Sequence, residues 1–279
     1  MNRRTLRRLL VPDLSAARLL LSLVFVYGSV ALLVWLFSDR MMFLPPPPQY
    51  TDADGIIKLR TAGGERIAAL YVPNPKADYT ILYGHGNAED LGVIRPLLPA
   101  LRELGVAVLA YDYRGYGTSE GRPSARAAYE DIDAAYGYLT RDLALPPQRI
   151  ILYGRSVGSG PAVDLAARQP VAGLILESAF VTAFRVMTRV PLLPFDTFRN
   201  IDKIGRVGCP VLVMHGLADD IVPAWHGRRL LAAAREPKRA LWVPGAGHND
   251  FQWVAGPRWA QALREFLALI RQGHPAVGA

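Results

Sequence analysis

The chain has 279 residues, and 51% of them are hydrophobic, which is enough to bury the core of one large α/β domain. Half of its net charge of +8 lies in residues 1–40, where six arginines and two aspartates give +4. No basic run interleaved with aromatic side chains follows, so the composition argues against nucleic-acid binding. Cys209 is the only cysteine, which excludes an intrachain disulfide and a cysteine-based metal cluster.

Residues 19–37 form an uncharged run of nineteen mostly apolar residues. At about 1.5 Å per residue, a helix of this length measures roughly 28 Å, close to the 30 Å or so of a bilayer's hydrocarbon core. A cleaved signal peptide is the alternative, but its apolar part spans only about 7–15 residues and ends at a small-residue cleavage site. Residues 38–42 offer no such site. The pattern therefore favours an uncleaved transmembrane helix.

The charges beside this run predict how the chain is oriented. Arginines crowd its N-terminal flank, and the positive-inside rule keeps such a flank in the cytoplasm. We expect a single-pass membrane protein with a cytoplasmic N-terminus and an extracytoplasmic globular domain, which would be periplasmic in a bacterium.

Five segments are expected along the chain. They are a basic tail (1–18), the transmembrane helix (19–37), a proline-rich linker (38–54), an α/β domain (55–272) and a short tail (273–279). The four prolines at 45–48 predict a stiff polyproline spacer between the helix and the domain.

Apolar runs typical of buried strands alternate with helical patterns through the domain. The expected strands are 56–60, 65–72, 79–83, 106–111, 149–153, 172–177, 210–214 and 239–243. The expected helices are 91–104, 124–139, 162–168, 225–234 and 257–271, with Ser124 as the N-cap of the second. The first two strands predict a β-hairpin around Ala62-Gly63-Gly64. The order of the others predicts a doubly wound, mostly parallel sheet.

The sequence Gly-Arg-Ser-Val-Gly at residues 154–158 lies where a predicted strand meets a predicted helix. A GxSxG sequence in that place is the nucleophile elbow, in which glycines permit a tight turn that exposes the serine hydroxyl. The other interpretation is a glycine-rich turn with an incidental serine. The position between strand and helix favours Ser156 as a nucleophile.

A serine hydroxyl needs a base to take its proton and an acid to orient that base. In elbow-bearing folds these residues follow the serine, acid first and histidine second, on loops at later strand ends. Only His248 lies in such a loop after a candidate acid, so we predict it as the general base rather than as a helix cap. The acid is Asp219 or Asp220, since either could reach the histidine while its neighbour caps the next helix. Asp250 fits a local turn.

An oxyanion hole needs two backbone donors beside the same serine. One is expected to be the Val157 N–H, directly after the nucleophile. The other is expected to be the Asn87 N–H, in the loop after the strand that ends at residue 83. His85 and the glycines beside it would shape that loop. Arg155 and Tyr153, which flank the elbow, are expected to contribute packing and fold electrostatics.

Residues 178–203 form an irregular, unusually apolar segment at the edge of the sheet where ligands bind in such folds. The segment is either a short cap that lines an acyl-chain groove or a satellite of the core under a small lid. The residues expected to line a groove are Phe180, Phe184, Met187, Leu192 and Phe195. The absence of a long insertion predicts a fairly open site.

Taken together, these motifs resemble the α/β-hydrolase superfamily. The matching stretches are YGHGNAED (83–90), YDYRGYG (111–117), LYGRSVGSG (152–160), LESAF (176–180), CPVLVMHG (209–216) and GAGHND (245–250). More narrowly, the chain is similar to membrane-anchored α/β-hydrolase-domain proteins of the acyl-protein-thioesterase-like and bud-emergence type. The resemblance covers about residues 55–270. It implies an eight-stranded sheet, the Ser156–Asp219–His248 triad and no metal or organic cofactor.

The chain departs from some of these relatives at its N-terminus. It lacks a cysteine-rich N-terminal region, so recruitment to the membrane by palmitoylation is not supported, and the apolar helix replaces it. An extracytoplasmic domain could not reach acylated proteins in the cytosol. This weakens a depalmitoylase interpretation and favours esters, lysolipids or lipid-linked substrates.

The expected function is a membrane-anchored serine hydrolase that cleaves carboxylic esters or thioesters of small-molecule or lipid-like acyl substrates. A serine nucleophile disfavours the dehalogenase and epoxide-hydrolase chemistry of the superfamily. One alternative is a serine-aminopeptidase-like peptidase, which would need an amine-binding acid, and the only acids of the cap are Asp196 and Asp202. The other alternative is a catalytically silent scaffold, against which the intact triad argues.

Overall fold

The computed structural model describes residues 16–273 and divides the chain into two units, one ending at Met41 and the other beginning at Met42. The predicted basic tail (1–18) and C-terminal tail (273–279) lie almost entirely outside the described residues.

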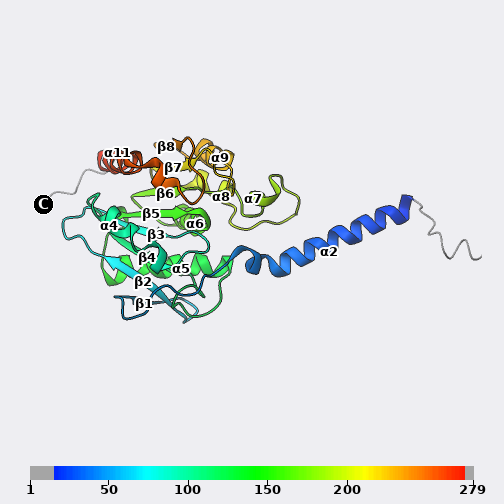
Figure 1. Ribbon diagram of the computed structural model, residues 1–279, viewed down its shortest axis with the longest axis horizontal. Coiled ribbons are helices and arrows are strands. Elements are labelled where there is room, and N and C mark those ends of the chain that lie inside the picture. Colours follow the sequence, from blue (N-terminus) through cyan, green and yellow to red (C-terminus); the bar gives the residue numbers. More distant parts are fainter. Residues whose placement is uncertain (1–15, 274–279) are drawn as a thin grey trace, which may run out of the picture. The chain divides into compact units, whose positions relative to one another are not determined.

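The first unit is described through one long helix, α2 (Ala16–Met42), drawn in blue in Figure 1. This helix is long and apolar enough to cross a membrane by length and composition, although a signal sequence near an N-terminus has the same properties. It has 27 residues, and so it is longer at both ends than the predicted span of 19–37.

The predicted linker, residues 38–54, is the main correction to the expected organisation. Its first residues continue α2, and the rest belongs to the second unit. Phe43 and Tyr50 are only 3% and 9% exposed, and the Tyr50 hydroxyl donates to the Asp112 carboxylate at 2.5 Å. The segment is therefore not a spacer, because its aromatic side chains pack into the domain.

The second unit is built on a sheet of eight strands, whose order is β1-β2-β4-β3-β5-β6-β7-β8. Figure 1 shows them side by side from β1 to β8. The strands are β1 (Ile57–Arg60), β2 (Arg66–Val72), β3 (Thr80–Gly84), β4 (Ala107–Tyr111), β5 (Ile150–Arg155), β6 (Gly173–Glu177), β7 (Val211–Gly216) and β8 (Lys238–Val243). The β1–β2 and β2–β4 pairs are antiparallel and all others are parallel. This confirms the predicted hairpin and the α/β-hydrolase fold.

Helices cover both faces of the sheet. They are α3 (Leu91–Ile94), α4 (Leu97–Arg102), α5 (Ala125–Gly137), α6 (Ser159–Arg168), α7 (Phe184–Thr188), α8 (Asn200–Lys203), α9 (Trp225–Ala233), α10 (Phe251–Ala255) and α11 (Pro257–Gly273). The chain also forms a π-helix, η1 (Tyr138–Asp142), and three 3₁₀ helices, η2 (Pro147–Arg149), η3 (Ser156–Gly158) and η4 (Ile204–Arg206). Side chains of α5, α6 and α9 pack in one core layer, and those of α4, α10 and α11 pack in the other.

The alternation of side chains along β5 explains why there are two layers. Ile150 and Leu152 point into the layer of α5 and α6, whereas Ile151 and Tyr153 point into the layer of α4 and α11. Because all of β5 is buried, its sequence is a continuous apolar run.

Two details of the helices refine the sequence-based prediction. The expected helix over 91–104 is divided into α3 and α4 at Pro96, which lacks an N–H for the helical ladder. The N-cap of α5 is confirmed, since the Ser124 hydroxyl accepts the Ala127 N–H at 3.0 Å.

Candidate active site

Ser156 directly follows β5 as the first residue of η3, and its turn is strained in the way an elbow requires. Ser156 has a φ of +50°, a left-handed conformation that non-glycine residues rarely adopt. A Cβ on Gly158 would lie 2.3 Å from the Gly84 carbonyl oxygen, and one on Gly154 would lie 2.6 Å from the Gly158 carbonyl oxygen. Only glycine fits at these two positions, so the GxSxG spacing is a steric requirement of the turn.

The structure brings Ser156, His248 and Asp219 together in a hydrogen-bonded chain. His248 Nε2 lies 3.0 Å from Ser156 Oγ, and His248 Nδ1 lies 2.8 Å from Asp219 Oδ2. These side chains come from the turn after β5, the loop after β7 and the loop after β8. Since those strands are parallel, their carboxyl ends meet at one edge of the sheet. All three residues are buried.

The Asp219 carboxylate is held in a single orientation by the backbone of its own loop. Its Oδ1 atom accepts the Ile221 N–H at 3.1 Å and the Val222 N–H at 2.7 Å, while Oδ2 faces His248. His215 Nε2 lies 3.3 Å from the same Oδ2. Burial raises the pKa of Asp219, but hydrogen bonds from His215 and His248 outweigh it and hold this pKa well below its usual range.

The neighbouring acids are placed differently. Asp220 is exposed. Asp250 accepts the Gly247 N–H at 2.6 Å, which is the local turn contact expected from its position. Of the two aspartates that the loop offers, Asp219 is thus the one that contacts His248.

The loop after β3 lies directly against the elbow. A Cβ on Gly158 would meet the carbonyl oxygens of both Gly84 and His85, at 2.3 and 2.9 Å. This close approach brings the loop that carries Asn87 beside the turn that carries Val157. The imidazole of His85 is buried under the loop, with Nε2 3.1 Å from Asp112 Oδ1, in agreement with a structural role.

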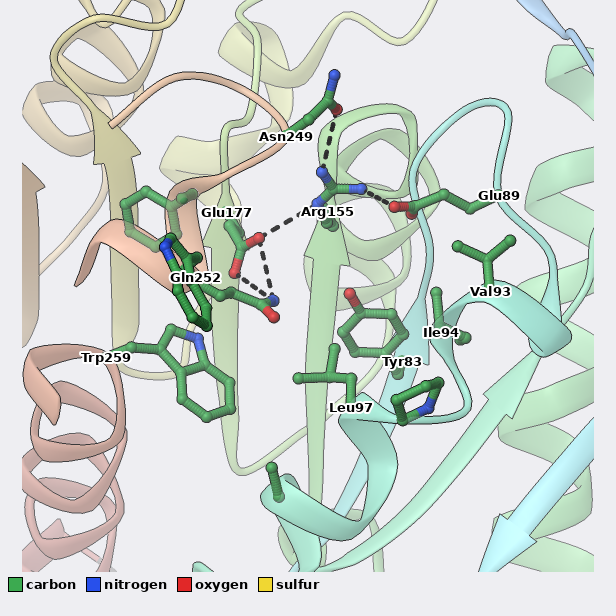
Figure 2. A pocket seen from close by; sticks show the side chains of 14 residues that line it. Tyr83, Glu89, Val93, Ile94, Leu97, Arg155, Glu177, Asn249, Gln252 and Trp259 are labelled. Atoms are coloured by element: carbon green, nitrogen blue, oxygen red, sulfur yellow. Dashed lines mark hydrogen bonds and ion pairs between the residues drawn. The ribbon is translucent and has the colours of Figure 1, made fainter. Parts of the chain in front are cut away.

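Arg155 has a larger part in the site than the sequence indicated. Its side chain is buried, and its guanidinium pairs with Glu89 after β3 and with Glu177 at the end of β6. The same group donates to the His248 carbonyl oxygen at 3.1 Å and to Asn249 Oδ1 at 3.4 Å. Figure 2 shows Arg155 between Glu89, Glu177 and Asn249. One cation thus links the elbow, the loop of Asn87 and the loop of His248.

A pocket of about 510 Å³ lies beside this ion-pair network, between α4, α10 and α11 (Figure 2). Its polar side includes Arg155, Glu89 and Glu177, and its apolar side includes Leu97 and Trp259. Neither Ser156 nor any residue of the predicted groove lines it. The pocket is therefore separate from the hydroxyl of the elbow.

The predicted cap, residues 178–203, contains α7 and α8 and divides into a buried and an exposed part. Phe180 is 5% exposed and packs in the core beside Phe198. Met187 and Leu192 are 82% and 58% exposed.

Phe184 and Phe195 lie between these extremes. Both are half-buried, and their rings meet edge to face with centroids 6.0 Å apart. Of the five residues predicted to line a groove, this pair is thus half-buried, Phe180 is buried, and Met187 and Leu192 are exposed.

No group of three or more His, Cys, Asp and Glu side chains within residues 16–273 is arranged to hold a metal ion. The arrangement that these residues do provide is a serine, a histidine and an aspartate in hydrogen-bonding order. Such an arrangement can activate a hydroxyl for attack on a carbonyl carbon.

Comparison with known proteins also points to a hydrolase. A family model described as "Serine aminopeptidase, S33" matches residues 75–195. Alpha/beta hydrolase domain-containing protein 17B of Xenopus laevis is 36% identical over 262 residues, which cover 83% of this chain and 90% of that protein.

Solved structures share the fold at lower identity. An esterase of Pyrococcus furiosus, Pf2001, superimposes with a TM-score of 0.68 at 19% identity, over 81% of this chain and 99% of its own. A monoacylglycerol lipase of Paleococcus ferrophilus gives a TM-score of 0.58 at 21% identity, over 73% of this chain and 99% of its own.

Proposed function

The chain belongs to the α/β-hydrolase superfamily, among its α/β-hydrolase domain-containing proteins, and from this premise we propose that it is a membrane-anchored serine hydrolase. Its substrates are carboxylic esters or thioesters of acyl, lipid-like compounds. The observation that carries the proposal is the chain of hydrogen bonds from Ser156 through His248 to Asp219.

The reaction begins at the Ser156 hydroxyl. His248 Nε2 takes its proton as the oxygen attacks the substrate carbonyl, and later gives that proton to the leaving alkoxide or thiolate. Asp219 keeps the Nδ1–H tautomer of His248 and stabilises the imidazolium that forms. Since its pKa is well below its usual range, the carboxylate stays ionised at neutral pH. Water then cleaves the acyl-enzyme by the same proton transfers in reverse order.

Two backbone donors bind the oxyanion of each tetrahedral intermediate. They are the N–H groups of Val157, which follows the nucleophile, and of Asn87, in the loop packed against the elbow. The mechanism needs no metal or organic cofactor, since the charge that develops is met by these donors and by Asp219.

Ester chemistry is favoured over peptide chemistry because both acids of the predicted cap already have partners. A serine aminopeptidase must bind the free amine of its substrate with a carboxylate. Asp196 already accepts hydrogen bonds from the Thr182 hydroxyl and the Phe184 N–H, and Asp202 is paired with Arg199 at 2.5 Å. The hydrogen-bonded triad likewise argues against a silent scaffold.

The proposal places α2 across the membrane as an uncleaved anchor, with a cytoplasmic N-terminus and an extracytoplasmic catalytic domain. Its support is the length and composition of the helix, the arginines before it, and the burial of Phe43 directly after it. The intact mass of the membrane-extracted protein distinguishes an anchor from a signal peptide. A C-terminal reporter that is active only outside the cytoplasm tests the orientation.

Hydrolysis of matched oxyesters and thioesters with acyl chains from short to long tests the enzymatic proposal. Ser156→Ala should lower kcat by about 10⁴-fold or more without altering the folded state. Ser124→Ala is the matched control, because it removes a helix cap remote from the site. It should cost about 1 kcal/mol of stability and leave kcat unchanged. Equal activity in wild type and Ser156→Ala would overturn the proposal.

A further inference from the structure

The segment that directly follows α2 is hydrogen-bonded to the side chain of Asn87. The Leu44 N–H donates to Asn87 Oδ1 at 2.9 Å, and Asn87 Nδ2 donates to the Met42 carbonyl oxygen at 2.6 Å. The Tyr116 hydroxyl donates to the same Oδ1 at 2.6 Å and accepts the Leu44 N–H at 3.0 Å. We refer to these contacts of Met42, Leu44, Asn87 and Tyr116 as the clamp.

The chemistry of these partners fixes the orientation of the Asn87 amide. A backbone carbonyl can only accept and a backbone N–H can only donate, so Nδ2 must face Met42 and Oδ1 must face Leu44. Rotating the amide by 180° would turn Nδ2 toward the Leu44 N–H, so that two donors face each other. It would also turn Oδ1 toward the Met42 carbonyl oxygen, so that two acceptors face each other. Both ends of the side chain are therefore held.

Further contacts of the same segment support the clamp. Phe43, between the two clamped residues, lies edge-on to the rings of Tyr116 and Phe198 with centroids 6.4 and 6.1 Å away. Further along the segment, the Gln49 N–H donates to Asp90 Oδ2 at 2.7 Å. Residues 42–49 thus follow the loop of Asn87 along its length.

We propose that the clamp positions the oxyanion hole: the chain that leaves the apolar helix holds the Asn87 side chain, and thereby sets where the Asn87 N–H points. The inference rests on the function proposed above. Asn87 carries the donor on its backbone, whereas Tyr116, Phe43 and Leu44 are positioning residues that do not touch the substrate.

A physical argument links the clamp to rate rather than to substrate binding. An oxyanion donor acts on the charge that develops in the transition state, so a small displacement lowers kcat while KM changes little. A displacement of about 1 Å can cost about a hundredfold in rate.

The experiment compares full-length wild type, Tyr116→Phe and Asn87→Ala in detergent, with p-nitrophenyl butyrate as substrate. Tyr116→Phe keeps the ring and removes two contacts of the clamp. We expect kcat to fall about tenfold with KM within about twofold, and Asn87→Ala to lower kcat further. Tyr136→Phe is the matched control, since it also removes a tyrosine hydroxyl that donates a hydrogen bond, in this case to the Pro170 carbonyl oxygen, away from the site.

Butylboronic acid supplies the readout that a merely structural role would not change. Its tetrahedral adduct with a serine presents a charged oxygen to the oxyanion hole, so its affinity should weaken in parallel with kcat in Tyr116→Phe. Unchanged kcat and boronate affinity in that variant would overturn the inference, as would a fall in kcat explained by lost thermal stability alone. Because Tyr116→Phe is conservative, it decides the matter even where Asn87→Ala does not fold.

Failure of the proposed function is recognised separately. If Ser156→Ala hydrolyses the ester as fast as wild type, the hydrolase proposal fails before the clamp variants are compared. If Ser156 is required and Tyr116→Phe still matches wild type, only the clamp is wrong.

Discussion

The sheet edge that carries Ser156 and the predicted cap over residues 178–203 differ in how tightly their side chains are held. At the edge, Ser156, Asp219 and His248 are all buried and hydrogen-bonded, and the turn that carries Ser156 admits only glycine at two positions. In the cap, Met187 is 82% exposed and α7 has five residues. The backbone therefore holds the residues of the proposed chemistry in place, whereas few contacts constrain the part proposed to select substrates.

Separate substitutions of the neighbouring Asp219 and Asp220 should give the largest difference in kcat. Asp219→Asn should lower kcat by about 10⁴-fold, because an amide favours the wrong tautomer of His248 and does not stabilise its imidazolium. Asp220→Asn should change kcat by less than twofold or so, since Asp220 is exposed. Steady-state kinetics on one p-nitrophenyl ester measures both. A similar loss in both variants would contradict the assignment of Asp219.

Substitution of the buried Arg155 should give the next largest effect, on both stability and kcat. Arg155→Met leaves the buried Glu177 and the partly buried Glu89 without their arginine partner, which should cost about 3–5 kcal/mol of unfolding free energy. It also releases the His248 carbonyl oxygen, so kcat should fall as well. Urea unfolding and kcat are measured together.

Arg126→Met is the control for the loss of an arginine ion pair. The Arg126 side chain is 91% exposed and pairs with Glu130 along α5, so its removal should cost about 0.5 kcal/mol or less. If Arg155→Met were no more costly than this control, the network around Arg155 would be ordinary surface electrostatics.

His226 joins the two regions, and it should make their connection sensitive to acid. Its Nδ1 atom accepts the Val181 N–H at the base of the cap at 3.1 Å, which requires a neutral ring. Burial, together with His215 and Arg185, lowers the pKa of His226 to about 4. The unfolded chain, with an ordinary value of 6.5, then takes up the proton first. Stability should be full above about pH 6.5 and fall progressively toward pH 4.

Urea midpoints between pH 7 and pH 4 check this for wild type and His226→Gln, which keeps an acceptor but cannot be protonated. The variant should show a flatter dependence over that range. Asp219 does not account for such a slope, because its pKa is depressed and its contribution is lost only below about pH 4. An unchanged slope in His226→Gln would exclude this histidine as the cause.

How far the sequence could predict the structure depends on the distance between interacting residues. The elbow and His248 could be assigned because each lies in a local pattern of strand, turn and helix. Phe43 and Tyr50 were assigned to a linker because their partners, such as Asp112 and Tyr116, come more than sixty residues later. Nothing near the prolines at 45–48 indicates that these aromatic side chains are buried.

Arg155 and the cap were incompletely predicted for related reasons. The partners of Arg155 come from three separate loops, so no spacing in the sequence joins them. In the cap, Phe180 and Met187 are both apolar residues in an aperiodic segment, and periodicity cannot tell the buried one from the exposed one.

The smallest expected effect addresses what the exposed part of the cap does. Met187→Ser should leave folding and the hydrolysis of short esters unchanged, because the side chain is 82% exposed. If the cap contacts the acyl chain, kcat/KM for long-chain esters alone should fall by up to about tenfold, since about 0.8 kcal/mol accompanies each buried methylene. Kinetics over a series of chain lengths measures the difference. If kcat/KM changes equally at every chain length, Met187 acts on the site through folding. If kcat/KM changes at no chain length, selection of the acyl chain is confined to Phe184, Phe195 and the residues nearer Ser156.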